Sequence, residues 1–182
     1  RVGTRSLSGV ESVIVVSSRP RFESRPGMRE AVIVGVADVP LIGGRITEPT
    51  TPLRLLAQVA GDALSDAGIG MSDVDGLLCT GAWNVPWPGP HVVMLADYLG
   101  IRPRFVDGTN VGGSAFESHV AHAALAIQGG MCDVALVTYA STQKSDRRSY
   151  TGGSKRAGWS GGAESTMQFE APWGLLRPSG AY

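Results

Sequence analysis

The sequence lacks the features that mark several common classes of protein. Its 182 residues carry 16 Lys and Arg against 16 Asp and Glu, so the formal net charge is zero. This balance gives neither the basic patch typical of nucleic-acid binding nor an acidic tail. No apolar run reaches the roughly 20 residues that a membrane-spanning helix needs. No repeat, heptad pattern or GxGxxG motif is present, so a nucleotide-binding domain has little support beyond the glycine in the first apolar run.

Cysteine is scarce as well. Cys79 and Cys132 are the two cysteines, and they form neither a CxxC pair nor any pattern of metal ligands. A reduced, cytoplasmic setting fits them best, and each is most simply a small buried apolar group. The content of 43% hydrophobic and 18% charged residues is that of a soluble globular protein.

From residue 29 onward, apolar runs alternate with amphipathic segments. The runs predict strands at residues 29–36, 76–80, 104–107 and 133–139. Helices are expected at residues 51–67, 91–99 and from 114 to about 127, the first capped by Thr51 and Gly68 with Pro52 at its first position. The near-continuous first run is typical of a parallel strand buried on both faces. The order predicts a layered α/β fold.

The two ends of the chain differ in character from this middle part. Residues 1–27 are rich in Arg and Ser, with a short apolar run at residues 13–16, and we expect them to lie outside the fold. Residues 28–140 then form the α/β domain. Residues 141–182 begin with a long polar stretch rich in Gly and Ser, which is longer than an ordinary connection.

One stretch, residues 107–117, combines a strand end, a glycine turn and a helix start. Gly112 and Gly113 allow a sharp turn and a close approach by another group. Ser114 and Glu117 have the spacing of a capping box. The free N–H groups of the helix start suit a developing oxyanion. A strand–helix turn without chemistry remains the alternative.

Two histidines and a tryptophan-rich loop are further candidates. His119 and His122 lie three residues apart and share a helical face. No third ligand has suitable spacing, so we predict hydrogen-bonded helix residues and no metal site. Trp83 and Trp87 can line an apolar substrate channel, or pack at a subunit contact.

Several strings, in their order and spacing, resemble the N-terminal half of a thiolase, closest to the sterol-carrier or lipid-transfer thiolase group. The strings are AVIVGVADVP, LAQVAGDALSDAGIGMSDVDGLL, VVMLADYLGI, GGSAFESHVAHAALAIQGG and CDVALVTYASTQ. The resemblance covers residues 28–182. It implies the thiolase-like α-β-α-β-α fold with only its N-terminal half present, and makes residues 141–182 a covering loop that is truncated.

The resemblance also shows a departure. It places Gly113 where catalytic thiolases have their nucleophilic cysteine, and Gly113 cannot form a thioester. Ser114 can replace the cysteine only with a base to activate it. The string GGSAFESHVAHA resembles the cysteine-less acyl-CoA retro-aldolases, the steroid side-chain lyases, whose acid/base residues lie in the absent second half. This implies a carbon–carbon lyase acting on a steroid or branched β-hydroxyacyl-CoA. A thiolase-type acyltransferase and a non-catalytic lipid-binding subunit are the alternatives.

The same resemblance implies further contacts. The coenzyme A thioester is the substrate, and no separate cofactor is expected. Gly112 and the two tryptophans are expected to bind this substrate. So are residues that follow the last strand, since ligands approach α/β sheets at the carboxyl ends of the strands: Tyr139, Ser141, Gln143, Arg147 and Arg148. The arginines lie in a basic run that can meet the CoA phosphates or can simply be a solvated loop. A homodimer through the strand of residues 104–110 and a partner protein with an OB-fold are also implied.

Overall fold

The structure is a computed structural model of the whole chain. It describes residues 12–18, 29–42, 46, 50–80, 91–111 and 114–140. All of them belong to a compact unit, Arg1–Tyr150, and a second unit, Thr151–Tyr182, lies outside the described residues.

Strands and helices alternate along most of the described chain. The strands are β1 (Ser12–Ser18), β2 (Ala31–Asp38), β3 (Gly76–Cys79), β4 (Phe105–Asp107) and β5 (Val134–Tyr139). The helices are α1 (Pro52–Ala67), the short 3₁₀ helix η1 (Met71–Asp73), α2 (His91–Leu99) and α3 (Ala115–Gln128). The four strands and three helices predicted from residue 29 onward are therefore confirmed.

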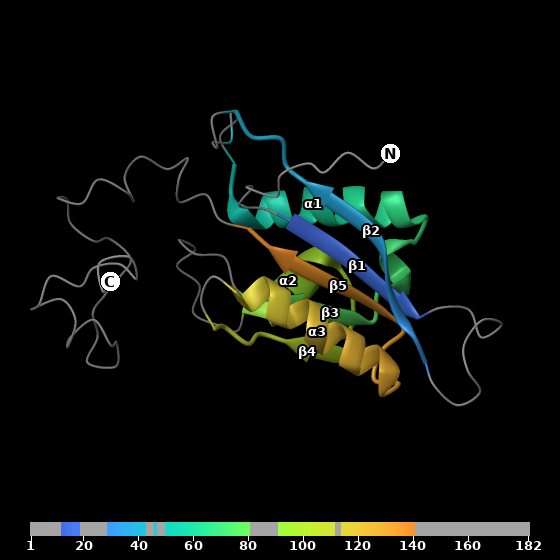
Figure 1. Ribbon diagram of the computed structural model, residues 1–182. Coiled ribbons are helices and arrows are strands. Elements are labelled where there is room, and N and C mark those ends of the chain that lie inside the picture. Colours follow the sequence, from blue (N-terminus) through green and yellow to red (C-terminus); the bar gives the residue numbers. More distant parts are fainter. Residues whose placement is uncertain are drawn as a thin grey trace, which may run out of the picture. The chain divides into compact units, whose positions relative to one another are not determined.

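The strands form one mixed sheet in the order β2-β1-β5-β3-β4 (Figure 1). Strand β3 is parallel to both of its neighbours, β4 and β5. Strand β1 is antiparallel to both β2 and β5. It follows that β2, β3, β4 and β5 all run in the same direction, so they begin at one edge of the sheet and end at the opposite edge.

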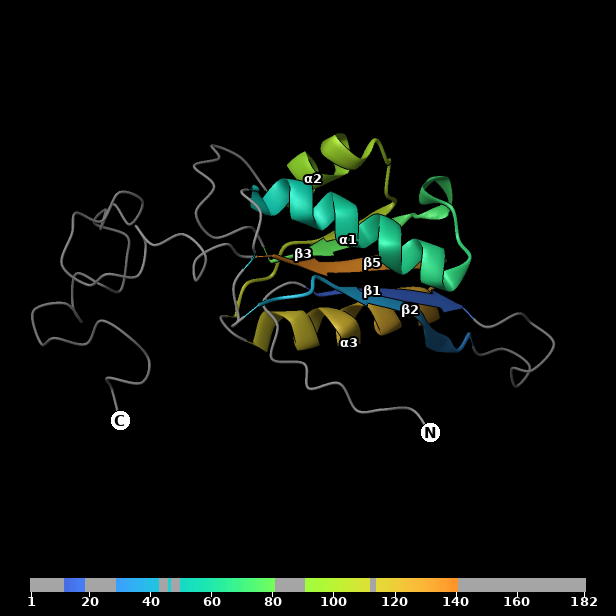
Figure 2. The same ribbon diagram turned by 90° about the horizontal axis from the view of Figure 1, so that it is seen from above.

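Helices cover the sheet on both faces, which confirms the predicted layered α/β fold. Helices α1 and α2 lie over one face and α3 lies over the other (Figure 2). The larger core cluster packs beneath α1 and α2, around side chains such as Leu56, Val59 and Leu136. A smaller cluster packs beneath α3 and includes Leu78, Ile127 and Val137. Burial of these apolar side chains is the main force that holds the layers together.

The prediction that residues 1–27 lie outside the fold is wrong for β1. Val13 and Val15 are fully buried beneath α1, and Val16 is buried on the α3 side. The strand lies between β2 and β5 and pairs with both along its length. Its apolar run is short, but both faces of a central strand are covered, so few residues supply much buried surface.

The prediction for β2 is right about the strand and wrong about its surroundings. Strand β2 is an edge strand, paired antiparallel with β1, and it is not buried on both faces. Ile33 and Val36 remain 53% and 47% exposed. Both pair with β1 residues on the α3 face, where α3 is the one helix of the described residues that covers the sheet. Apolar composition alone thus could not place the strand at the edge.

Local signals fix α1 as predicted. The Thr51 side chain accepts a hydrogen bond from the Arg54 backbone N–H at 3.3 Å, and Pro52 takes the first helical position. Gly68 ends the helix in the left-handed region at φ 67°. Helix α1 packs so tightly on β2 that a Cβ at Gly35 would lie 2.2 Å from the Ala63 carbonyl oxygen. A side chain at position 35 would therefore force the helix away from the sheet.

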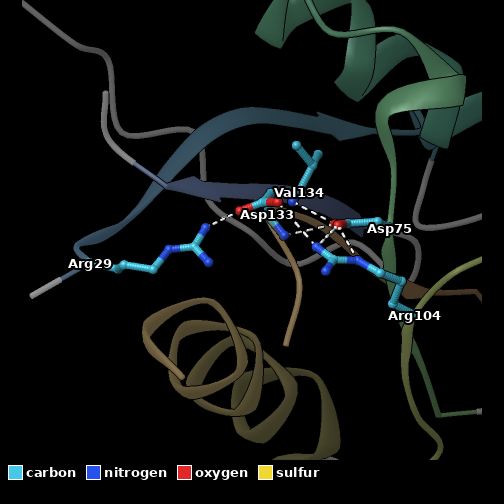
Figure 3. Close-up of polar contacts among 5 residues, drawn as sticks. All are labelled: Arg29, Asp75, Arg104, Asp133 and Val134. Atoms are coloured by element: carbon cyan, nitrogen blue, oxygen red, sulfur yellow. Dashed lines mark hydrogen bonds and ion pairs between the residues drawn. The ribbon is translucent and has the colours of Figure 1, made fainter. Parts of the chain in front are cut away.

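A charged network joins the starts of the parallel strands (Figure 3). Asp75, just before β3, accepts hydrogen bonds from the backbone N–H groups of Asp133 and Val134 at 2.8 and 2.9 Å. It also accepts two from Arg104, which precedes β4, at 3.1 and 2.5 Å. Asp133 in turn pairs with Arg104 and with Arg29. The network therefore fixes how the starts of the parallel strands align. It does not involve the carboxyl ends of these strands.

Candidate functional site

Polar side chains gather at the carboxyl ends of the parallel strands. Asp107 ends β4, Tyr139 ends β5, and Thr80 follows β3. Ser114 stands at the start of α3. In open α/β sheets, ligands bind at this edge, outside the carboxyl ends of the strands. The candidate site thus lies at the carboxyl ends of the parallel strands, and the charged network lies at their starts.

The Asp107 carboxylate organises the connection from β4 to α3. Its Oδ1 accepts hydrogen bonds from the Thr109 backbone N–H at 2.8 Å and from the Thr109 hydroxyl at 2.7 Å. Its Oδ2 lies 2.5 Å from Nδ1 of His122. Partial burial opposes ionisation, but the contacts with Thr109, His122 and His119 outweigh it, so the pKa of Asp107 lies below its usual 3.8. Asp107 is therefore ionised at neutral pH.

His119 is the buried member of this cluster. Its side chain is fully buried, and Nε2 lies 3.9 Å from Oδ1 of Asp107. Neither ring nitrogen has a hydrogen bond of normal geometry to the described residues. Burial lowers the pKa of His119 below 6.5, although the Asp107 charge and the Thr109 backbone oppose this shift. The expectation of two hydrogen-bonded histidines thus holds for His122 and fails for His119, because the 3.9 Å gap to Asp107 is too long for a hydrogen bond.

The buried His119 predicts a pH dependence of stability. Because its pKa is lower in the folded chain than the ordinary 6.5, the unfolded chain binds the proton more tightly. The stability contributed by the neutral ring is complete above pH 6.5. It is lost as the pH falls from there towards the folded-state pKa. We expect the free energy of unfolding to fall with pH in this window, with a slope no steeper than the limit of about 1.4 kcal/mol per pH unit for one titrating group.

Urea unfolding at several pH values between 5 and 8 measures this slope. A His119→Leu variant removes the titrating ring, and it is expected to lose less stability than the wild-type chain over the same pH range. Equal slopes for both proteins would contradict the assignment of the acid sensitivity to His119.

The predicted capping box at the start of α3 is absent. Ser114 occupies the N-cap position, but its side chain makes no cap hydrogen bond. Its backbone, at φ −96° and ψ 9°, lacks the extended geometry that a capping side chain needs and that Thr51 has. Its carbonyl oxygen instead accepts a hydrogen bond from the Ser118 hydroxyl at 3.1 Å. The Ser114 hydroxyl therefore does not occupy the N–H groups of the first helical turn.

Both cysteines are buried, as predicted, and the two do not form a disulfide with each other. Cys132 lies at the amino edge of the sheet, next to Asp75 and Arg104 in the charged network. Burial and the nearby Asp75 raise its pKa to about 11. It is a neutral thiol at physiological pH and therefore a poor nucleophile. Cys79 is 2% exposed in the core beneath α1 and α2.

The structure describes two of the predicted site residues, Ser114 and Tyr139. Ser114 is exposed and Tyr139 is half-buried, and both lie at the carboxyl edge. The other predicted site residues lie outside the described residues: Trp83, Trp87, Gly112, Gly113, Ser141, Gln143, Arg147 and Arg148. Their roles stay predictions.

Sequence reasoning missed the part played by Asp107. An Asp directly after an apolar run, with Thr two residues later, is a recognisable signal for a turn held by a side chain. The contact to His122, fifteen residues further on, needs the packing of α3 against β4 and has no such signal. No group of three His, Cys, Asp or Glu side chains suited to a metal ion was found in the described part of the chain. No helix there is long and apolar enough to cross a bilayer.

The chain is similar in sequence to one known protein and in fold to several solved structures. No protein-family model matches the chain. The chain is 32% identical over 156 residues to a 17-hydroxy-3-oxo-4-pregnene-20-carboxyl-CoA lyase of Mycobacterium tuberculosis; the match covers 84% of this chain and 37% of that protein. The structure of an Ltp2–ChsH2(DUF35) aldolase matches 96% of this chain and 36% of its own, with a TM-score of 0.54 and 20% identity. OleA of Xanthomonas campestris with bound lauric acid and lauroyl-CoA matches 50% of this chain at a TM-score of 0.43.

The aldolase match shows a shared fold. Together with the lyase, it supports the thiolase-like, lipid-transfer resemblance in general, without fixing the subgroup. The chain spans little more than a third of the length of the lyase, at 37%. The match therefore does not by itself assign the activity of the lyase to this chain.

Proposed function

We propose that this chain is part of a thiolase-like acyl-CoA lyase that cleaves a carbon–carbon bond of a β-hydroxyacyl-CoA by a retro-aldol reaction. The observation that carries the proposal is Gly113, a residue without a side chain at the position of the nucleophilic cysteine in the family it resembles. The similarity to a pregnene-carboxyl-CoA lyase supports the same reaction class. A steroid or another branched acyl group is the proposed substrate.

The reaction needs no covalent bond to the protein. A base takes the proton of the β-hydroxyl group, and the oxygen lone pair forms the new carbonyl. The bond between the α and β carbons breaks, and its electron pair moves to the thioester oxygen as an enolate. Protonation of the α carbon then gives the shortened acyl-CoA and a ketone or aldehyde.

The start of α3 suits the enolate step. A helix start presents N–H donors and a partial positive charge, which stabilise a developing oxyanion. The Ser114 hydroxyl does not occupy these donors. We assign no general base to this chain, because the resemblance places the acid/base residues in a second half. The substrate contacts proposed for Tyr139 and for residues 141–148 remain part of this hypothesis.

The proposed assembly has two further parts. Strand β4 is an edge strand of the sheet, and its Val106 side chain is 45% exposed. A homodimer through residues 104–110 would pair this edge with its counterpart in a second copy. The second part is a partner protein with an OB-fold. The matched aldolase is an Ltp2–ChsH2 assembly, which is consistent with a partner.

Product analysis tests the proposed reaction. The full-length protein, with its partner if one co-purifies, is incubated with a β-hydroxy steroid CoA ester and, separately, with acetyl-CoA. We expect equal amounts of a ketone and a shortened acyl-CoA from the first substrate and no acyl transfer with the second. Acyl transfer without any carbon–carbon cleavage would favour the acyltransferase alternative. If neither reaction occurs, the result would favour the alternative of a non-catalytic lipid-binding subunit.

A further inference from the structure

The Asp107 carboxylate connects two segments that are distant in sequence. Thr109, two residues beyond the end of β4, donates two hydrogen bonds to its Oδ1. His122, on the second turn of α3, contacts its Oδ2 at 2.5 Å. One side chain therefore ties the exit from β4 to the side of the helix that follows.

The burial of the three side chains distinguishes their roles. Asp107 is 14% exposed and His119 is fully buried, so the carboxylate has little freedom to turn away. His122 is 40% exposed and lies at the outer side of the cluster. Short hydrogen bonds to an ionised carboxylate are roughly twice as strong as neutral ones. The contact between Asp107 and His122 is thus strong, while the His122 ring contributes little to the core.

We propose that Asp107 and His122 are positioning residues for the proposed lyase reaction, and that they hold residues 109–111 in a fixed relation to the first turns of α3. The inference rests on the proposed function, because the start of α3 is where the enolate oxygen is expected to bind. A thioester misplaced by about 1 Å can lose roughly 100-fold in rate. Neither residue needs to touch the substrate to have this effect.

Steady-state kinetics of the full-length protein on a β-hydroxyacyl-CoA tests the inference. We expect His122→Ala and Asp107→Asn each to lower kcat by roughly 10- to 100-fold, with KM changed less than about threefold. His122→Asn is expected to recover much of kcat, because its amide N–H can donate to Asp107 from a place near Nδ1. Gln128→Ala, an exposed change at the other end of α3, is the control and is expected to leave kcat unchanged.

Stability measurements separate positioning from simple unfolding. The half-exposed His122 ring makes us expect a melting temperature within a few degrees of the wild type for both His122 variants. Folded His122→Ala with wild-type kcat overturns the inference. So does a loss of kcat that His122→Asn does not relieve, or one that appears only in KM.

Hydrogen exchange separates this inference from the proposed function. Without substrate, we expect the backbone N–H of Thr109 to exchange faster in His122→Ala than in the wild type, because its acceptor is less firmly held. If the wild-type protein cleaves no β-hydroxyacyl-CoA, the proposed function fails. The exchange rates alone then test whether Asp107 and His122 hold residues 109–111 against α3. Exchange at residues 109–111 that is unchanged in both His122→Ala and Asp107→Asn then overturns the inference.

Discussion

A Val15→Asp variant is expected to lose about 4 kcal/mol or more of its free energy of unfolding. Val15 is fully buried in β1, where it pairs with Gly35 on one side and Leu136 on the other. A carboxylate there would be buried in the apolar core beneath α1 without a partner, which is among the most costly single changes. Urea unfolding, or the yield of soluble protein if the variant does not fold, measures the effect.

Ile33→Asp is the matched control, since it places the same charge on the neighbouring strand. Ile33 is 53% exposed on the edge strand β2, so its replacement is expected to cost less than about 1 kcal/mol. Equal losses for the two variants would show that β1 does not occupy the middle of the sheet.

The second large effect is expected at Asp75. Its replacement by alanine removes the acceptor of two backbone N–H groups and of Arg104 in one step. Because hydrogen bonds to a charged group contribute more than neutral ones, and because the two N–H groups lose their partner, we expect a loss of roughly 3 kcal/mol. Asp133→Ala removes an acceptor with a side chain that is 57% exposed, so it is expected to cost less than about 1 kcal/mol. A larger loss at Asp133 than at Asp75 would contradict this account of the network.

The same network makes a prediction about acid. Burial opposes ionisation of Asp75, but the Val134 and Asp133 backbone N–H groups and Arg104 together lower its pKa below 3.8. The stability that it contributes is therefore complete above pH 3.8 and is lost as the pH falls through the folded-state pKa. Most of the wild-type advantage over Asp75→Ala should thus disappear only in strong acid, well below the range in which His119 acts.

The sequence could predict elements that depend on local signals, but not strand positions that depend on pairing between distant segments. Helix α1 was predictable, because Thr51, Pro52 and Gly68 are local signals that act within a turn of the helix ends. The place of β2 at the edge was not, because it depends on β1 lying between β2 and β5. The four-residue apolar run in β1 is too short to show by itself that it pairs with two other strands.

The candidate site shows the same division. The position of Ser114 at the start of α3 followed from the sequence, but the absence of its cap hydrogen bond depends on backbone angles that no spacing reveals. The sequence placed Asp107 at a strand end and His122 on a helix, and only the packing of α3 beside β4 brings them together. Gly113, which carries the functional proposal, was informative through its lack of a side chain.

The proposed retro-aldol reaction proceeds without an acyl group attached to the protein. Intact-mass spectrometry of the full-length protein during turnover of an acyl-CoA substrate measures this directly. We predict that the protein keeps its unmodified mass while carbon–carbon cleavage products accumulate. A protein mass increased by one acyl group, formed and lost at the rate of turnover, would contradict the claim.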